Sequence, residues 1–336
     1  MNAYRSMDRV LMGIAAAGAL FLAACSDGGK AGRGSTASPQ ADFYGDPPLA
    51  VEQFLIAEGE QGAPRELRFF VPTTAGQYPL LQFQHGFISD VDTYTVMLEK
   101  LAGFGFVVVG PQMYVGDPST APSVPDETAA AVQVLAWVQA NADNLVAQNL
   151  QADVAVTVAT GSTGLLGHSR GGQVAWRMLF DHAAEISASA IAGVDPVDGD
   201  APPFPPGGTG ELVTDDPGAF AFPFASLIIG MGQGASGAPG FECAPSNRNY
   251  RLFYEASAAP KYEVVATGHG HSDMLNGDEP NAVCPGAVDG SRAALRVFIA
   301  GQLAAYFHSV LIGQDARALL RDLSDAPVPA SGRFEE

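Results

Sequence analysis

The segment TGLLGHSRGGQVAW at residues 163–176 most constrains what this chain can fold into. A short apolar run ends at a glycine, a histidine and a serine follow, and two further glycines lead into a helical pattern. GHSRG at 167–171 matches G-x-S-x-G, in which a sharp strand-to-helix turn exposes the serine hydroxyl above a sheet. The strand-like run before it and the helical pattern after it favour Ser169 as a nucleophile over a plain glycine-rich connection. The amide of Arg170 would begin the helix and point at a developing oxyanion.

The rest of the chain alternates strand-like and helix-like segments. Short apolar runs bounded by glycine or proline predict strands, and apolar spacing near 3.6 residues predicts helices. This alternation, with the serine turn, predicts an α/β-hydrolase fold whose mostly parallel central sheet carries helices on both faces. Asp126 is expected to cap one helix. The expected strands are 67–72, 78–86, 104–112, 163–167, 187–195, 224–230 and 261–267, and the expected helices are 92–103, 126–148, 171–182 and 291–311.

A serine nucleophile needs a base, for which this chain has few candidates. The base of such an enzyme is a histidine oriented by an acid, and in this fold the order along the chain is serine, acid, histidine. The strand at 261–267 runs directly into GHGHSDML, the loop where the base belongs. Spacing alone does not choose between His269 and His271. His308 falls in the last helix, where it is expected to be a packing or surface residue.

The acid has several candidates. In this fold it commonly follows the strand predicted at 224–230, but the loop there reads MGQGASGAPG and has no carboxylate before Glu242. The preceding strand ends in GVDPVDG, which places Asp195 at the strand tip. Three more carboxylates follow in the same region and are candidates too, although by themselves they indicate a solvated loop: Asp198, Asp200 and Asp215.

A second oxyanion donor is expected in the loop after an early strand. FQHGF at 83–87 resembles the H-G element found there, which makes the amide of Phe87 the donor. His85 and His168 are then expected to be hydrogen-bonded positioning residues. The proline- and glycine-rich stretch at 197–223 is predicted to be either a lid or a surface insertion.

Five segments together are more specific than the general serine motif: GHSRGG (167–172), GVDPVDG (193–199), CAP (243–245), NYRLFYEAS (249–257) and GHSDML (270–275). They resemble the chlorophyllases and their bacterial relatives, one family of the α/β-hydrolases, and the resemblance spans roughly residues 79–310. Plant members of the family cleave the phytyl ester of chlorophyll, so the resemblance implies a serine esterase, for which we expect no cofactor. It also implies the triad Ser169, Asp195 and His271, since the family's acid lies on the strand after the nucleophile and its base precedes x-D-M-L.

Two other functions use the same features. A lipase, polyester hydrolase or acyltransferase would need the same triad and the same acyl-enzyme. A non-catalytic lipoprotein that binds a surface could also retain the hydrolase scaffold. An intact triad favours catalysis over binding alone.

The N-terminus predicts export. Residues 1–24 have a positive start and an apolar stretch, as signal peptides do, and LAAC before and at Cys25 resembles a bacterial lipobox. The expectation is a membrane-anchored lipoprotein, with a flexible tether over 25–45 and a single hydrolase domain over 46–336; an ordinary signal peptide is the competing interpretation. If Cys25 carries lipid, Cys243 and Cys284 remain as a disulfide pair or as two unpaired thiols, and export favours the disulfide.

Charge and motif spacing exclude several partners. The net charge is −19, and such a surface repels nucleic acid and anionic lipid. The cysteines lack a C-x-x-C partner for zinc, and DPVDGD lacks the spacing of a calcium loop. We therefore expect a monomer without metal or cofactor, whose partner is a small-molecule or lipid-like ester and whose membrane contact is the N-terminal lipid alone.

Overall fold

The computed structural model describes residues 42–336 except 115, 200–211, 213–216, 237–241, 278–283, 285 and 287–290. The predicted signal peptide, Cys25 and the tether up to residue 41 lie outside the described residues, as does most of the stretch at 197–223. The strands are β1 (Val51–Ile56), β2 (Glu66–Pro72), β3 (Gly76–Gln84), β4 (Val107–Gln112), β5 (Val156–His168), β6 (Ala190–Val194), β7 (Ser226–Met231), β8 (Lys261–Ala266) and β9 (Ala330–Glu335). The helices are α1 (Thr95–Gly103), α2 (Val124–Asn149), α3 (Arg170–Asp181), α4 (Tyr250–Ala256), α5 (Arg292–Phe307) and α6 (Ala318–Arg321).

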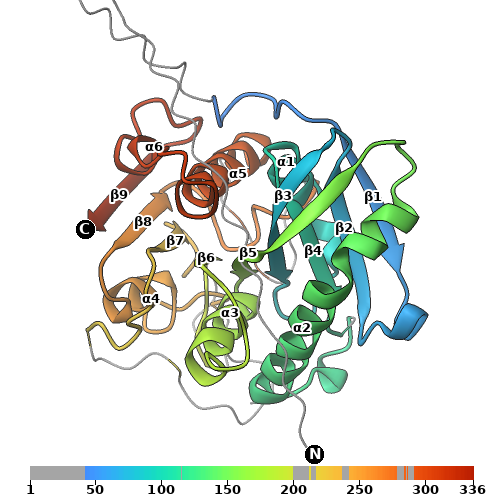
Figure 1. The fold of residues 1–336 in the computed structure, drawn as a ribbon. Helices are drawn as coiled ribbons and strands as arrows, with labels where there is room; N and C mark the ends of the chain where they lie inside the picture. The colour runs from blue at the N-terminus through green and yellow to red at the C-terminus, as the bar shows by residue number, and fades with distance from the viewer. Residues whose placement is uncertain are drawn as a thin grey trace, which may run out of the picture. The chain divides into compact units, whose positions relative to one another are not determined.

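All of these strands belong to one sheet, in the order β1-β2-β4-β3-β5-β6-β7-β8-β9 (Figure 1). The strands from β4 to β8 in this order pair in parallel, whereas β1, β2 and β9 are antiparallel additions at the two sides. The predicted α/β fold with a mostly parallel sheet is confirmed. Because parallel strands end at the same edge, residues that follow β3, β5, β6 and β8 can meet there.

The strand register sets two of the site residues side by side. His168 at the end of β5 is opposite Val194 at the end of β6. The next residue of each strand, Ser169 and Asp195, therefore leaves the sheet at the same level. The end of β3 is paired with the same part of β5, which brings the loop after Gln84 to the other side of Ser169.

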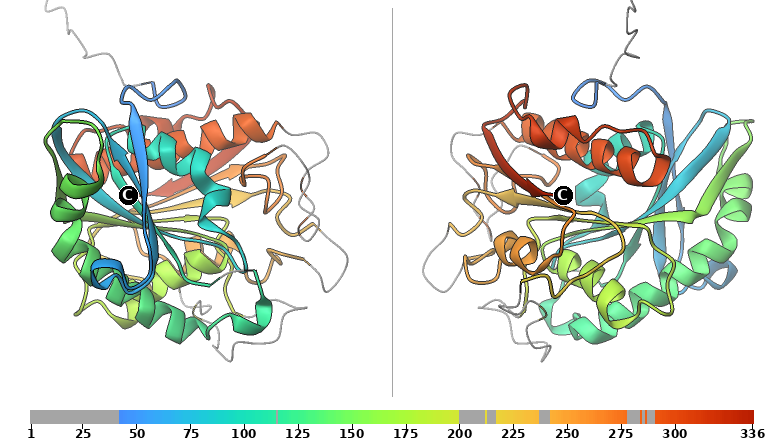
Figure 2. Two further views of the ribbon diagram at one scale, coloured as in Figure 1. Left: turned by 90° about the vertical axis from the view of Figure 1, so that its right-hand side faces the viewer. Right: turned by 60° about the vertical axis from the view of Figure 1, so that its left-hand side comes forward.

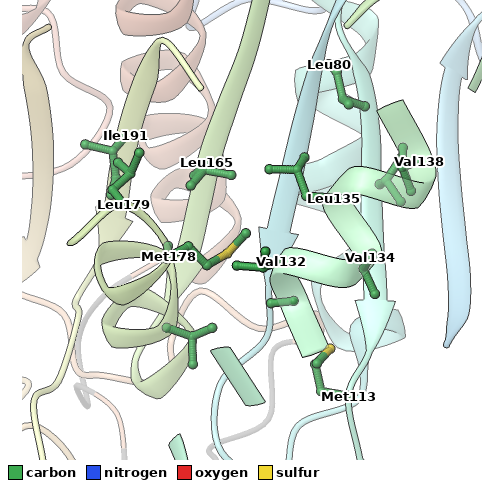
Figure 3. Packing of buried hydrophobic residues seen from close by; sticks show 14 of the residues in the cluster. Leu80, Met113, Val132, Val134, Leu135, Val138, Leu165, Met178, Leu179 and Ile191 are labelled. Carbon is green, nitrogen blue, oxygen red and sulfur yellow. The ribbon is translucent and has the colours of Figure 1, made fainter. Parts of the chain in front are cut away.

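Helices cover both faces of the sheet (Figure 2). α2, α3 and α4 contribute to one buried apolar cluster, and α1, α5 and α6 contribute to the other. Side chains of α2 such as Leu135 and Val138 lie over Leu80 of β3 and Leu165 of β5 (Figure 3). Among the described residues, 292–312 are apolar and long enough to cross a membrane, but most of this stretch is buried against the sheet, as in the core helix of a globular fold.

Serine side chains fix where two of the helices begin. Ser123 accepts a hydrogen bond from the backbone N–H of Asp126 and caps α2, so the predicted cap at Asp126 was wrong by one turn. A proline in the first turn suits this start, because the missing N–H has no intrahelical partner there. Ser291 caps α5 in the same way by accepting from the N–H of Ala294. Both helices thus start where a side-chain oxygen replaces a missing carbonyl.

Candidate active site

Ser169 lies on the turn between β5 and α3, with a backbone φ of 56° and ψ of −128°. A non-glycine residue rarely adopts a positive φ, and such strain persists only where the surroundings impose it. The surroundings here are tightly packed backbone: a Cβ on Gly167 would lie 2.6 Å from the Gly172 nitrogen, and a Cβ on Gly171 would lie 2.5 Å from the His85 oxygen. The glycines of GHSRGG are therefore required by close approach of α3 to β5 and to the end of β3.

His271 bridges Ser169 and Asp195. Its Nε2 is 2.8 Å from the Ser169 Oγ, and its Nδ1 is 2.7 Å from the Asp195 Oδ2. All three side chains are nearly inaccessible to solvent, with at most 9% of the residue surface exposed. The structure thus places His271, and not His269, next to the serine; the Nε2 of His269 faces the Ser291 carbonyl oxygen instead, at 3.3 Å.

Asp195 follows β6 and is itself in a left-handed conformation, with φ 41°. Its Oδ2 accepts from His271 Nδ1–H, and its Oδ1 accepts from the N–H of Met231, at 3.0 Å. Asp198 is equally buried, but its carboxylate accepts from Gln173 and from the N–H of Leu212. The hydrogen bond from the His271 Nδ1 thus goes to Asp195.

The remaining acid candidates are Asp200, Asp215 and Glu242, and the remaining histidine candidate is His308. Asp200 and Asp215 are outside the described residues, and Glu242 does not bond to the His271 ring. His308 follows α5, where its Nε2 bonds to the Phe104 carbonyl and its ring packs against Phe43 and Phe106, so it is a packing residue as expected.

Asp273 holds the loop that carries His271. Its Oδ2 accepts from the N–H of Gly270 at 2.7 Å, and its Oδ1 accepts from the Arg292 Nε at 2.9 Å. The ion pair is buried, so losing either partner would leave a desolvated charge. Apart from its place in the GHSDML motif, the sequence has no signal for this role of Asp273.

The two predicted oxyanion donors belong to residues that contact each other. The guanidinium of Arg170 lies 5.4 Å from the centre of the Phe87 ring, and the loop before Phe87 is pressed against the nucleophile, since a Cβ on Gly86 would lie 3.4 Å from the Ser169 Cβ. Arg170 is held by a 2.8 Å bond from its Nε to the Oε2 of Glu127. Burial raises the pKa of Glu127 to about 7, against the opposing effect of the nearby guanidinium. Glu127 had no sequence signal that would connect it to the site.

His85 and His168 are both buried and hydrogen-bonded, as expected. His85 Nδ1–H donates to the Gly86 carbonyl, and its Nε2 accepts from the N–H of Met113. Burial lowers the pKa of His85 to about 4. Burial, and next to it the proximity of His271, lowers the pKa of His168 well below its ordinary value. Neither histidine is therefore protonated near neutral pH.

Cys243 and Cys284 form a disulfide, which confirms that prediction. The bridge joins the segment after β7 to the segment after the His271 loop, across a sequence separation of 41 residues. Within the described ranges, no group of three or more His, Cys, Asp and Glu side chains is arranged to hold a metal ion.

The sheet order, the helices on both faces and the serine turn between β5 and α3 make this protein an α/β-hydrolase. The family model described as Chlorophyllase matches residues 43–331. Chlorophyllase-1 of Arabidopsis thaliana is 30% identical over 318 residues, which cover 87% of this chain and 91% of the relative. Chlorophyllase-1, chloroplastic, of Citrus sinensis is 28% identical over 79% of each chain, and Chlorophyllase-2 of Arabidopsis thaliana is 26% identical over 75% of this chain and 79% of its own. The chain belongs to the chlorophyllase family, as the sequence resemblance predicted, and is a carboxylic ester hydrolase.

Proposed function

We propose that this protein hydrolyses carboxylic esters through a Ser169–His271–Asp195 triad and an acyl-enzyme. The observation that carries the proposal is the unbroken line of hydrogen bonds from the Ser169 hydroxyl through the His271 ring to the Asp195 carboxylate. Membership of an esterase family supports the reaction class, and the strained turn supports the choice of serine.

In the first half of the reaction, His271 Nε2 takes the Ser169 proton as Oγ attacks the ester carbonyl carbon. The Asp195 carboxylate stabilises the imidazolium, and the amides of Phe87 and Arg170 bind the negative oxygen of the tetrahedral intermediate. The imidazolium then donates its proton to the leaving alcohol, which departs and leaves the acyl group on Ser169. In the second half, His271 deprotonates a water molecule that attacks the acyl carbon, and the acid is released as Ser169 regains its proton.

The nucleophile is tested by Ser169→Ala against Ser226→Ala, with hydrolysis of a p-nitrophenyl ester as the assay. Ser226 is a matched control because it is buried and its hydroxyl has no hydrogen-bond partner among the described residues. We expect Ser169→Ala to lower kcat by about 10⁶-fold. Ser226→Ala should leave kcat within about twofold, because Ser226 does not contact the reacting atoms. Unchanged turnover by Ser169→Ala would overturn the mechanism.

The acid is tested by Asp195→Asn against Asp198→Asn, the same change at an equally buried carboxylate. Asparagine at 195 would leave the imidazole in the wrong tautomer, so kcat should fall by about 10⁴-fold. Asp198→Asn should affect stability and leave the pH profile of kcat unchanged. A larger loss in Glu242→Gln than in Asp195→Asn would move the acid to the loop after β7.

The substrate proposal follows the relatives, whose names all describe chlorophyllases. We propose an ester with a long apolar alcohol as the preferred substrate class. The test is a panel of esters that vary separately in acyl length and in alcohol bulk, with chlorophyll included. A preference that follows acyl length alone would contradict the proposal.

We also propose that the chain is exported and anchored through lipid on Cys25. The Cys243–Cys284 disulfide supports export, because structural disulfides persist in oxidising compartments and are rare in the cytosol. The full chain should fractionate with membranes, and Cys25→Ser should release it. If the unsubstituted chain and Cys25→Ser are distributed equally between the membrane and soluble fractions, the proposed lipid anchor is wrong.

A further inference from the structure

A chain of buried hydrogen bonds crosses the site without passing through the triad. The N–H of Gly86 donates to the Tyr94 hydroxyl at 3.1 Å, and that hydroxyl is 2.8 Å from the Nδ1 of His168. The Nε2 of His168 is 3.1 Å from the backbone carbonyl oxygen of His271. Tyr94 and His168 have 0% and 3% of their surface exposed, so water does not compete for these bonds.

The two ends of this chain fix its direction. A backbone N–H can only donate and a backbone carbonyl can only accept. The His271 carbonyl can only accept, so His168 Nε2 carries a proton and donates it to that oxygen. The neutral ring has no second proton, so His168 Nδ1 accepts from the Tyr94 O–H, whose oxygen in turn accepts from the Gly86 N–H. The lowered pKa of His168 agrees with a neutral ring that accepts at one nitrogen and donates at the other.

The two ends of this series of hydrogen bonds, Gly86 and His271, belong to different parts of the proposed machinery. Gly86 directly precedes Phe87, whose amide is the proposed oxyanion donor. His271 is the proposed base, and its backbone is what His168 holds. His168 itself directly precedes Ser169 in the chain, so its ring is fixed relative to the nucleophile by covalent geometry.

We propose that Tyr94 and His168 are positioning residues that set the base and the oxyanion loop relative to Ser169. The inference rests on the proposed triad. Both the 85–88 loop and the 270–274 loop lie beyond the ends of strands, where the sheet ladder no longer aligns the backbone. The Tyr94–His168 chain supplies the missing cross-links, and preorganised geometry of this kind contributes to the rate because oxyanion donors act only when correctly placed.

The first test is Tyr94→Phe against Tyr306→Phe. Tyr306 is the matched control because its buried hydroxyl, like that of Tyr94, accepts from one backbone N–H, of Ile191, and makes one further hydrogen bond, to the carbonyl of Ala225. Ile191 is near the start of β6 and Ala225 directly precedes β7, whereas the site residues follow the ends of the strands. Each variant loses two buried hydrogen bonds, so both should be destabilised alike. Tyr94→Phe should lower kcat, and the rate at which a fluorophosphonate labels Ser169, by about tenfold to a hundredfold with KM within about twofold. Tyr306→Phe should change neither rate.

The second test is His168→Gln against His168→Met, two side chains of similar length. Glutamine offers an acceptor for Tyr94 and an N–H for the His271 carbonyl, and methionine offers neither. We expect glutamine to recover most of the labelling rate and kcat that methionine loses. This comparison remains decisive even if Tyr94→Phe does not fold.

The outcomes separate this inference from the proposed function. If Ser169→Ala retains full activity, the triad is wrong and the positioning role falls with it. If Ser169 is required but Tyr94→Phe matches Tyr306→Phe in kcat, the positioning role alone is overturned. Equal rates for His168→Gln and His168→Met would overturn it as well.

Discussion

The packing of α3 against the end of β3 makes Gly171→Ala the most informative single substitution at the serine turn. A Cβ at this position would come closest to the carbonyl oxygen of Gln84, and it would lie 2.5 Å from both the Gln84 carbonyl carbon and the His85 carbonyl oxygen. These are backbone atoms, which cannot rotate away as a side chain would. Real Cβ contacts are essentially never below 3.0 Å, so α3 and the end of β3 must separate by more than about 0.5 Å.

This separation acts directly on the proposed oxyanion hole. Arg170 begins α3 and Phe87 follows the end of β3, so the two amides move apart when these elements do. Because a misplacement of about 1 Å can cost about 100-fold, we expect kcat/KM to fall at least tenfold. The free energy of unfolding should fall by about 1–3 kcal/mol, as for other overpacked sites.

The assay compares Gly171→Ala with Gly161→Ala, in ester hydrolysis and in urea denaturation. Gly161 precedes the same turn on β5, and a Cβ there would meet nothing within 4 Å. Gly161→Ala should leave both measurements near the starting protein. A Gly171→Ala variant with unchanged kcat/KM would refute the argument that this glycine is required by the geometry of the site.

Three further predictions concern stability and the oxyanion loop. Replacing both Cys243 and Cys284 by serine should lower the free energy of unfolding by about 4 kcal/mol in urea denaturation, from loop entropy over their separation of 41 residues; a loss below about 1 kcal/mol would contradict this. Burial holds the pKa of His85 at about 4, below its ordinary 6.5, so the unfolded chain binds the proton first as pH falls. Unfolding free energies measured between pH 6.5 and 4 should therefore decrease with falling pH, by about 1.4 kcal/mol per unit from this group, and His85→Asn should flatten that slope. Arg170→Lys retains the charge but loses the planar group over the Phe87 ring, so kcat should fall while KM holds; a change in KM alone would contradict it.

The sequence predicted the strands and helices that carry a continuous apolar pattern. β4, with its run of valines, and β8 were placed within a few residues, as was α3. β1 and β9 were missed because they lie at the two sides of the sheet, where half-exposed and exposed residues give no alternation. α4 is only 7 residues long, which is too short for a helical period to stand out. In these elements pairing and packing with distant residues decide the structure.

β5 was predicted too short for a related reason. Its first half, from Val156, was interpreted as a polar link because of its threonines. The structure pairs this half with the start of β3, and the register then shifts between Pro79 and Leu80. Residues that bulge out of a ladder break the alternation by which a strand is recognised.

The site residues fall into the same two groups, those that local sequence predicts and those that depend on distant residues. Ser169 was predicted from local sequence alone, because the turn that exposes it is encoded by its own neighbours. His271 and Asp195 needed the family resemblance, since nothing local distinguishes one loop histidine or carboxylate from the next. The contributions of Tyr94 and Glu127 depend on residues 74 and 43 positions away in the chain, which only the folded structure brings together.

The structure explains why the loop after β7 has no carboxylate in the position where this fold commonly has its acid. The loop after β7 has no carboxylate near its start, although the acid of this fold commonly lies there. In the structure the Asp195 carboxylate reaches across from the neighbouring strand and accepts from the N–H of Met231, at the end of β7. A Cβ on Gly234 would lie 2.6 Å from the Asp195 Oδ2, the same oxygen that accepts from His271. An acid on β6 and a larger side chain at the start of the β7 loop would therefore compete for one space, and the glycine at 234 is what allows Asp195 to fill it.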